Sequence, residues 1–431
     1  MPSEHKPAAA AGSSRSALAS SLALLRTRRF GTFWFASLLS SIGTWAQQVA
    51  QPWLLLTLGA SPVLIGLDAF AMSAPVWLLT LAGGYLADHA DRRRVITGFQ
   101  SVQMLCPLAI VALLLAGTIR PWMIIALSLV VGVTDALSMP SFSSIVPTIV
   151  ERAQIGAGLA LNATQFNLSR ILGPALAGVL MASVGALGCF LASALSYLPF
   201  IGIALWVLPH GKNAGGAAPQ APPHAIPRAP PRRPYADLAA IARDPTRRGA
   251  LLTTFSCSLL CAPVVAFCPV LVKDVLHGTA WQFSLSVGAF GCGGLLGAMG
   301  LLAVDARHDR RLLGSRFAVA FALALTAIAL IPWFWALVAL LVVAGLAMST
   351  TNIATNTLLQ SSGVAGTQGQ AVSLYMLAMR GGIALGSLAT GISAHLLGIR
   401  AALLVNGLLA LLAQLWIRRG WLAPHRSPAL I

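Results

Sequence analysis

Twelve long apolar stretches follow one another along this 431-residue chain, and they constrain its fold more than any other feature. A bilayer span needs about 20 mostly apolar residues, and in lipid a helix satisfies its own backbone polar groups. Charged residues make up 9% of the chain, whereas an ordinary soluble domain has about 25%. The sequence therefore predicts a polytopic all-α membrane protein and excludes a soluble enzyme, a disordered chain and a coiled coil. The expected spans are 31–57, 63–86, 95–117, 121–141, 158–183, 187–208, 249–272, 282–303, 314–331, 333–357, 371–396 and 400–417.

The positive charge of the chain is distributed unevenly between the two sides of the membrane. The formal charge is +17, and 23 of the 28 Lys and Arg residues fall on the side that holds both termini. Only Arg120, Lys273 and Arg400 fall on the other side. Cytoplasmic loops carry an excess of Lys and Arg, so we expect both termini in the cytoplasm. This asymmetry explains the charge without a nucleic-acid partner.

A Pro-, Ala- and Gly-rich segment divides the spans six and six and is interpreted as a flexible linker. The two halves show weak self-similarity, because Asp88 and Arg170 of the first half have counterparts in Asp305 and Arg380 of the second. Two related six-helix halves are a transporter architecture. The predicted organisation is a cytoplasmic tail 1–29, a helical bundle 30–208, a cytoplasmic linker 209–248, a second bundle 249–418 and a cytoplasmic tail 419–431.

No sequence pattern indicates enzyme or metal chemistry. The six cysteines lie in apolar stretches and are interpreted as small buried residues. Cys257 and Cys261 are spaced to share a helix face, but no Cys-x-x-Cys pair or His accompanies them. No Gly-Lys-Ser/Thr phosphate loop is present, so ATP does not drive this chain directly. We expect a protein that is not an enzyme and uses no metal or cofactor.

The end of the second span carries the motif Gly84-x-Leu86-Ala87-Asp88-x-x-Asp91-Arg92-Arg93. This motif resembles the 2–3 loop signature of the major facilitator superfamily, with Asp91 where Gly is usual and His89 where Arg is usual. The Asp91 form resembles a subfamily of bacterial exporters that includes the enterobactin exporters. Residues 43–50, Asp135 to Pro140 and 162–178 resemble that subfamily as well.

The resemblance covers about residues 25–420. It implies the major facilitator fold, with twelve transmembrane helices in two pseudo-symmetric bundles, in the bacterial inner membrane.

The resemblance also implies a conformational gate. In members that this chain resembles, the loop Asp caps the N-terminus of span eleven and the following Arg pairs with an acid on span four. By this resemblance, Asp88 and Arg92 hold the two halves together when the substrate site faces outward, and the Asp135 carboxylate is the acid that pairs with Arg92. The gate residues are Gly84, Asp88, Arg92 and Asp135.

Four charged residues lie within the expected spans: Asp68, Asp135, Arg170 and Arg380. A charge at mid-bilayer costs at least about 2.5–3.5 kcal/mol, so each is expected to face the interior or to pair. Asp68 has no near opposite charge in the sequence, and burial disfavours the charged form of a carboxylate. Asp68 and Asp135 are therefore the protonation candidates. The alternatives are a wetted outer vestibule for Asp68 and a structural ion pair for any of the four.

Polar residues at helical spacing within the spans are expected to line a substrate cavity between the halves, because polar atoms in lipid are costly. The two Arg residues among them either attract an anionic or catecholate-like substrate or neutralise Asp135 and Asp68. The cavity candidates are Gln47, Gln51, Asn162, Gln165, Arg170, Asn352, Asn356, Tyr375 and Arg380.

Span five carries Gly173, Pro174 and Gly178, which bend a helix or allow close approach of a neighbour. The stretch resembles the antiporter signature of drug–proton exchangers, with Ala177 where Gly is usual. The alternative interpretation is ordinary tight packing of helices.

These patterns together predict a secondary transporter that exports a small organic molecule by proton antiport and alternating access. By resemblance, the substrate is siderophore-like or an amphiphilic drug. The expected partners are the lipid bilayer, the substrate and protons, and the protein is expected to act as a monomer. Two alternatives stay open: a proton-coupled importer of a small metabolite, and a membrane receptor or scaffold that does not transport.

Overall fold

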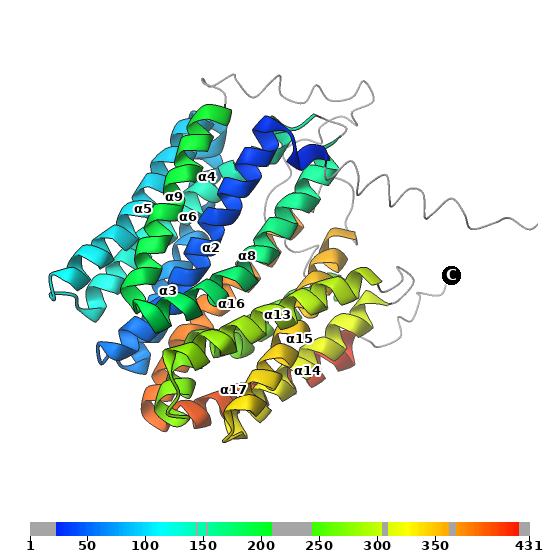
Figure 1. Ribbon diagram of the computed structural model, residues 1–431. Coiled ribbons are helices and arrows are strands. Elements are labelled where there is room, and N and C mark those ends of the chain that lie inside the picture. The colour runs from blue at the N-terminus through cyan, green and yellow to red at the C-terminus, as the bar shows by residue number, and fades with distance from the viewer. Residues whose placement is uncertain are drawn as a thin grey trace, which may run out of the picture.

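The computed structural model describes residues 23–143, 145–151, 154–208, 244–303, 309–361 and 368–421, and these residues form helices without strands. The predicted tails and linker lie largely outside these ranges. Figure 1 shows two helical bundles, one from each half of the chain. The first bundle consists of α2 (Arg28–Thr57), α3 (Pro62–Ser73), α4 (Pro75–His89), α5 (Arg92–Leu115), α6 (Pro121–Ser143), α7 (Ile145–Ile149), α8 (Ile155–Ser183) and α9 (Ala186–Val207).

The second bundle begins with a span built from four consecutive helical pieces, and five long helices follow it. Its elements are α11 (Pro245–Ser256), η2 (Cys257–Cys261), α12 (Pro263–Val270), η3 (Leu271–Val275), α13 (Ala280–Ala303), α14 (Arg310–Leu330), α15 (Phe334–Ser361), α16 (Gln368–Leu397) and α17 (Ile399–Trp421).

Ten segments of the described chain are long and apolar enough to cross a membrane. The helices α2 and α16 are not among them, because their polar residues lower the mean hydropathy, but each is 30 residues long and packs within its bundle. With these two, the described chain has six spanning segments in each half. The prediction of an all-helical membrane protein in two bundles is confirmed.

Two expected spans are interrupted where the sequence analysis treated them as continuous. The span 63–86 breaks between α3 and α4 at Pro75, since proline has no N–H to donate and crowds the preceding turn. The span 249–272 contains the π-helical turn η2 and the start of the π-helical turn η3, with Pro263 two residues after the end of η2 and Pro269 two residues before the start of η3. These prolines give the seventh span its irregular backbone.

The two bundles contact each other mainly through two helix pairs, α3 with α16 and α8 with α13. In Figure 1 the bundles lie close together at the end where α2 finishes and diverge toward the end where α2 begins. At the close end, the rings of Trp53 and Phe283 stack at a centroid distance of 5.5 Å. There the Lys273 ammonium also donates to the Leu56 carbonyl at 3.4 Å. The halves are therefore closed at one end in this conformation.

Candidate substrate and proton site

A buried carboxylate of the first bundle is held by side chains from two other helices. Asp68 on α3 is 7% exposed. The Gln51 amide on α2 donates to its two carboxylate oxygens at 3.0 and 2.8 Å. The Ser128 hydroxyl on α6 donates to Asp68 Oδ1 at 2.6 Å and accepts from Gln51 at 2.7 Å. No ion pair to Asp68 occurs within the described ranges. The carboxylate thus has neutral hydrogen-bond partners and is shielded from solvent.

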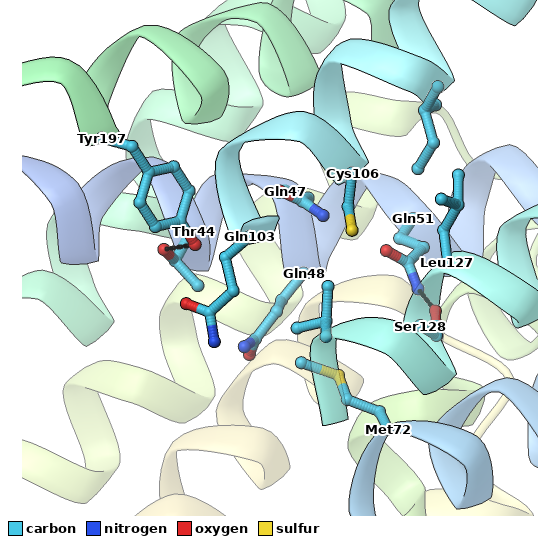
Figure 2. Close-up of a pocket in the computed structure, with 12 residues that line it drawn as sticks. Thr44, Gln47, Gln48, Gln51, Met72, Gln103, Cys106, Leu127, Ser128 and Tyr197 are labelled. Atoms are coloured by element: carbon cyan, nitrogen blue, oxygen red, sulfur yellow. Dashed lines mark hydrogen bonds between the residues drawn. The ribbon is translucent and has the colours of Figure 1, made fainter. Parts of the chain in front are cut away.

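A small cavity lined by both polar and apolar side chains borders this cluster. Figure 2 shows the amide side chains of α2 and α5 at this cavity, between Tyr197 and Leu127. The cavity lies within the first bundle, whereas we expected a site between the halves. Gln47 and Gln51 line it as their spacing suggested. Its full lining is Thr44, Gln47, Gln48, Gln51, Met72, Gln103, Cys106, Ile110, Leu127, Ser128, Val131 and Tyr197.

Hydrogen bonds connect the helices around this cavity. Ser193 on α9 donates to Gln47 Oε1 at 2.7 Å, and the hydroxyls of Thr44 and Tyr197 lie 3.1 Å apart. The Gln103 amide on α5 donates to the Thr134 hydroxyl on α6 at 3.2 Å. Gln48, Gln103, Thr44 and Tyr197 were not predicted, although Gln100 and Gln103, three residues apart, also share one face of a helix, as Gln47 and Gln51 do at a spacing of four.

One ion pair joins the two halves within the described residues. Arg380 Nη2 on α16 lies 4.0 Å from Asp135 Oδ2 on α6, and their side chains are 32% and 43% exposed. Arg92, which was expected to pair with Asp135 in the outward-facing state, instead donates to the Thr148 hydroxyl at 2.7 Å. The expected Arg92–Asp135 pair is absent from the described residues in this conformation. The sequence suggested that Arg380 either attracts an anionic substrate or neutralises a carboxylate. In this structure it lies beside the Asp135 carboxylate.

The other predicted gate residues lie on α4. Gly84 and Asp88 fall within this helix, but the surroundings of Gly84 and the side chain of Asp88 are outside the described part of the chain. The expected contact of Asp88 with span eleven therefore stays a prediction.

Arg170 lies near the middle of α8 and faces the second bundle. Its guanidinium carbon lies 5.6 Å from the centroid of the Trp45 ring on α2. A Cβ added at Gly294 on α13 would lie 3.9 Å from Arg170 Nη2. The two other cavity candidates on α8, Asn162 and Gln165, have different surroundings. Asn162 is exposed, and Gln165 is buried and donates to the Ser37 carbonyl at 3.0 Å. Of these three, Arg170 is the residue that the structure places at the half-to-half contact.

The cavity candidates Asn352, Asn356 and Tyr375 lie on the second bundle, and Tyr375 packs inside it. Tyr375 is 4% exposed, and its hydroxyl donates to the Asn352 carbonyl at 3.2 Å. It belongs to an apolar cluster with Leu359 and Trp421. Asn352 and Asn356 are partly buried on α15. The structure thus joins α15 to α16 through Tyr375.

The glycines of the span-five motif allow close approach of neighbouring helices. A Cβ at Gly173 would clash with Trp45 of α2. A Cβ at Gly178 would lie 2.9 Å from the Trp281 ring of α13. Pro174 lies inside α8, which continues without a break from Ile155 to Ser183. The motif therefore packs α8 against its own half at Gly173 and against the other half at Gly178.

The fold of this chain is that of known transporters. The nucleoside transporter NupG is 14% identical, with 92% of this chain and 99% of that chain covered at a TM-score of 0.73. A bacterial homologue of the iron transporter ferroportin, solved in an inward-facing state, is 16% identical. It covers 90% of this chain and 98% of its own at a TM-score of 0.64. Identities this low show the fold alone.

Two named relatives are similar in sequence. The staphyloferrin A transporter of Staphylococcus aureus (strain NCTC 8325 / PS 47) is 28% identical over 181 residues. That match spans 42% of this chain and 45% of the relative, so the chain matches less than half of it. The multidrug efflux pump Tap of Mycobacterium tuberculosis (strain ATCC 25618 / H37Rv) is 26% identical over 398 residues, which are 88% of this chain and 91% of the pump. The family model described as transmembrane secretion effector matches residues 19–428. The chain is thus a member of the transmembrane secretion effector family of major facilitator superfamily transporters.

Proposed function

We propose that this protein exports a small organic molecule across the bacterial inner membrane in exchange for protons, by alternating access. The single observation that carries the proton coupling is the buried Asp68 carboxylate, whose partners among the described residues are neutral side chains of α2 and α6. The names of two relatives, a staphyloferrin A transporter and a multidrug efflux pump, support export of small molecules. The substrate class taken from them is siderophore-like or amphiphilic.

The orientation of the protein in the membrane follows from the uneven distribution of Lys and Arg between its two sides. With both termini in the cytoplasm, the closed end that carries Lys273 faces outward and the diverging end faces the cytoplasm. The described conformation is then inward-facing and ready to load substrate. Closure of the diverging end, with release at the α2–α3 end, completes the export step.

Protonation of Asp68 changes the hydrogen bonds that hold three helices together. The ionised carboxylate accepts from Gln51 and Ser128, whereas a protonated carboxyl also has a hydrogen to donate. The added hydrogen needs an acceptor, which the side-chain oxygen of Gln51 or Ser128 supplies after rotation, and both side chains line the cavity. This gives a route by which proton binding alters the cavity. Asp135 is the second protonation candidate, and it lies at the half-to-half contact beside Arg380.

Flux measurements in inside-out vesicles test the proposal. An acid interior is imposed, and uptake of siderophores and dyes is compared for the wild type, Asp68→Asn and Asp274→Asn. Asp274 is a matched control because it is an exposed carboxylate at the closed end. We expect gradient-dependent uptake in the wild type and in Asp274→Asn and its loss in Asp68→Asn.

Each other outcome has a distinct meaning. Uptake that survives in Asp68→Asn moves the protonation site to another residue such as Asp135. Accumulation only in right-side-out vesicles with an acid exterior favours an importer. Binding of a compound without flux in either kind of vesicle favours a receptor or scaffold.

A further inference from the structure

The two arginines inside the membrane spans differ in their partners. Arg380 faces the carboxylate of Asp135 at 4.0 Å. Arg170 has no acidic side chain within ion-pair distance in the part of the chain that the structure describes. Asp68 does not neutralise it, because the carboxylate of Asp68 is bonded to Gln51 and Ser128. Among the described residues, Arg170 is therefore a cation at the half-to-half contact without an acidic partner.

The surroundings of Arg170 place its guanidinium between the halves. The Trp45 ring lies on one side at 5.6 Å, and α13 packs on the other. A Cβ at Gly291 would lie 2.8 Å from the Arg170 carbonyl oxygen, so α13 approaches the backbone of α8 closely there. One turn further, the Arg170 guanidinium lies 3.9 Å from the Cβ position of Gly294, which would also be 4.0 Å from Ser349 Cβ. None of these groups is anionic.

A cation without a countercharge is unfavourable inside a membrane, and a contact with the face of an indole offsets only part of that penalty. A guanidinium presents N–H donors in a planar fork that matches a carboxylate. We propose that Arg170, with Trp45 beside it, binds the anionic group of the exported molecule, so that the substrate is a small organic anion with a carboxylate or similar group. This inference rests on the proposed function and narrows its substrate class.

The position of Arg170 explains how such binding favours movement. Arg170 belongs to the first bundle, and Gly291 and Gly294, which lie beside it, belong to the second. A ligand held there contacts both halves, and it binds more tightly to the arrangement in which both contacts are made. A ligand shifts a conformational equilibrium by its difference in affinity for the two states.

Two dyes that share a xanthene ring but differ in charge test the proposal: carboxyfluorescein as the anion and rhodamine 123 as the cation. Uptake into inside-out vesicles with an acid interior is quantified after extraction, so that pH does not alter the signal. We expect Arg170→Gln to lower carboxyfluorescein uptake by about tenfold or more, the effect of losing a charge-assisted hydrogen bond. Rhodamine 123 uptake should not fall. Arg170→Lys should retain part of the activity, because it keeps the charge but lacks the fork.

The control variant is Arg400→Gln, because Arg400 is a half-buried arginine that donates to the Ile331 carbonyl at 3.3 Å, away from the half-to-half contact. It should leave uptake of both dyes unchanged. Equal loss of both dyes in Arg170→Gln, at normal membrane abundance, would overturn the proposal in favour of a purely structural arginine. Preferential loss of rhodamine 123 uptake would overturn it as well.

A binding measurement separates this inference from the proposed function. Equilibrium dialysis of the purified protein with carboxyfluorescein requires no transport. We expect the wild type to bind the anion and Arg170→Gln to bind it at least about tenfold more weakly. Anion binding without any gradient-dependent flux would contradict proton-coupled export and leave the role of Arg170 supported. Equal binding by both proteins would contradict the role of Arg170 whatever the flux.

Discussion

A single glycine at the closed end provides a strong test of alternating access. Gly66 on α3 faces α16, and a Cβ added there would lie 2.5 Å from the Ser387 carbonyl oxygen and 3.2 Å from Gly391 Cα. These neighbours are backbone atoms, so no side-chain rotation relieves the clash. Overpacking of this kind costs about 1–3 kcal/mol.

The penalty applies only to the conformation in which α3 and α16 touch at this end. Gly66→Ala should therefore shift the equilibrium away from the described conformation by about 5- to 150-fold, as a free-energy difference of about 1–3 kcal/mol implies. Electron-paramagnetic-resonance distances between spin labels at Thr57 and Thr279, in a background that carries Cys292→Ser, report the closed end. Both label sites are exposed, one in each half. We expect Gly66→Ala to gain a population with a longer label-to-label distance.

Two glycine variants serve as controls for this shift. Gly202→Ala adds a methyl group where nothing lies within 4 Å, so it should leave the distances unchanged. Gly345→Ala clashes with the Phe290 carbonyl inside the second bundle, so it should lower stability without favouring the open state. A distance distribution for Gly66→Ala that matches the wild type would refute the assignment of this glycine to the closed state.

Three further outcomes are expected. Asp68→Asn should bind substrate in equilibrium dialysis but lose gradient-driven uptake, because the amide accepts hydrogen bonds and takes up no proton near neutrality. Exchange of the charges in the double variant Asp135→Arg/Arg380→Asp should restore part of the flux lost in either single variant. The effect should be small, since a pair this exposed contributes about 0–1 kcal/mol. Gly291→Ala should reduce thermal stability in detergent, because its Cβ meets a backbone oxygen at 2.8 Å, whereas Gly294→Ala should be tolerated because its nearest contact is 3.8 Å.

The fold follows from the sequence because membrane insertion leaves few alternatives. Apolar stretches of spanning length predict the helices, and the prolines explain where the structure departs from them. Pro75 breaks the second span, and Pro263 and Pro269 accompany the π-helical turns of the seventh. These interruptions were not predicted, because hydropathy does not register the missing N–H of a proline.

The candidate site was only partly predictable. Spacing along one helix brought Gln47 and Gln51 to one cavity, since residues four apart share a face. Arg380 was considered in advance as a partner of Asp135. The partners of Asp68, Gln51 and Ser128, were not predicted, because they come from other helices whose relative placement the sequence does not encode locally. The burial of Tyr375 was not predicted for the same reason, because the other buried residues of its apolar cluster belong to other helices.

The most direct test of the central claim follows the protons themselves. Purified protein in proteoliposomes is loaded with substrate on the inside, diluted into buffer without substrate, and monitored with a pH indicator in the lumen. We expect protons to enter as substrate leaves in the wild type and no proton movement with Asp68→Asn. Protons that leave together with the substrate, or substrate movement in the wild type without any proton movement, would contradict proton-coupled export.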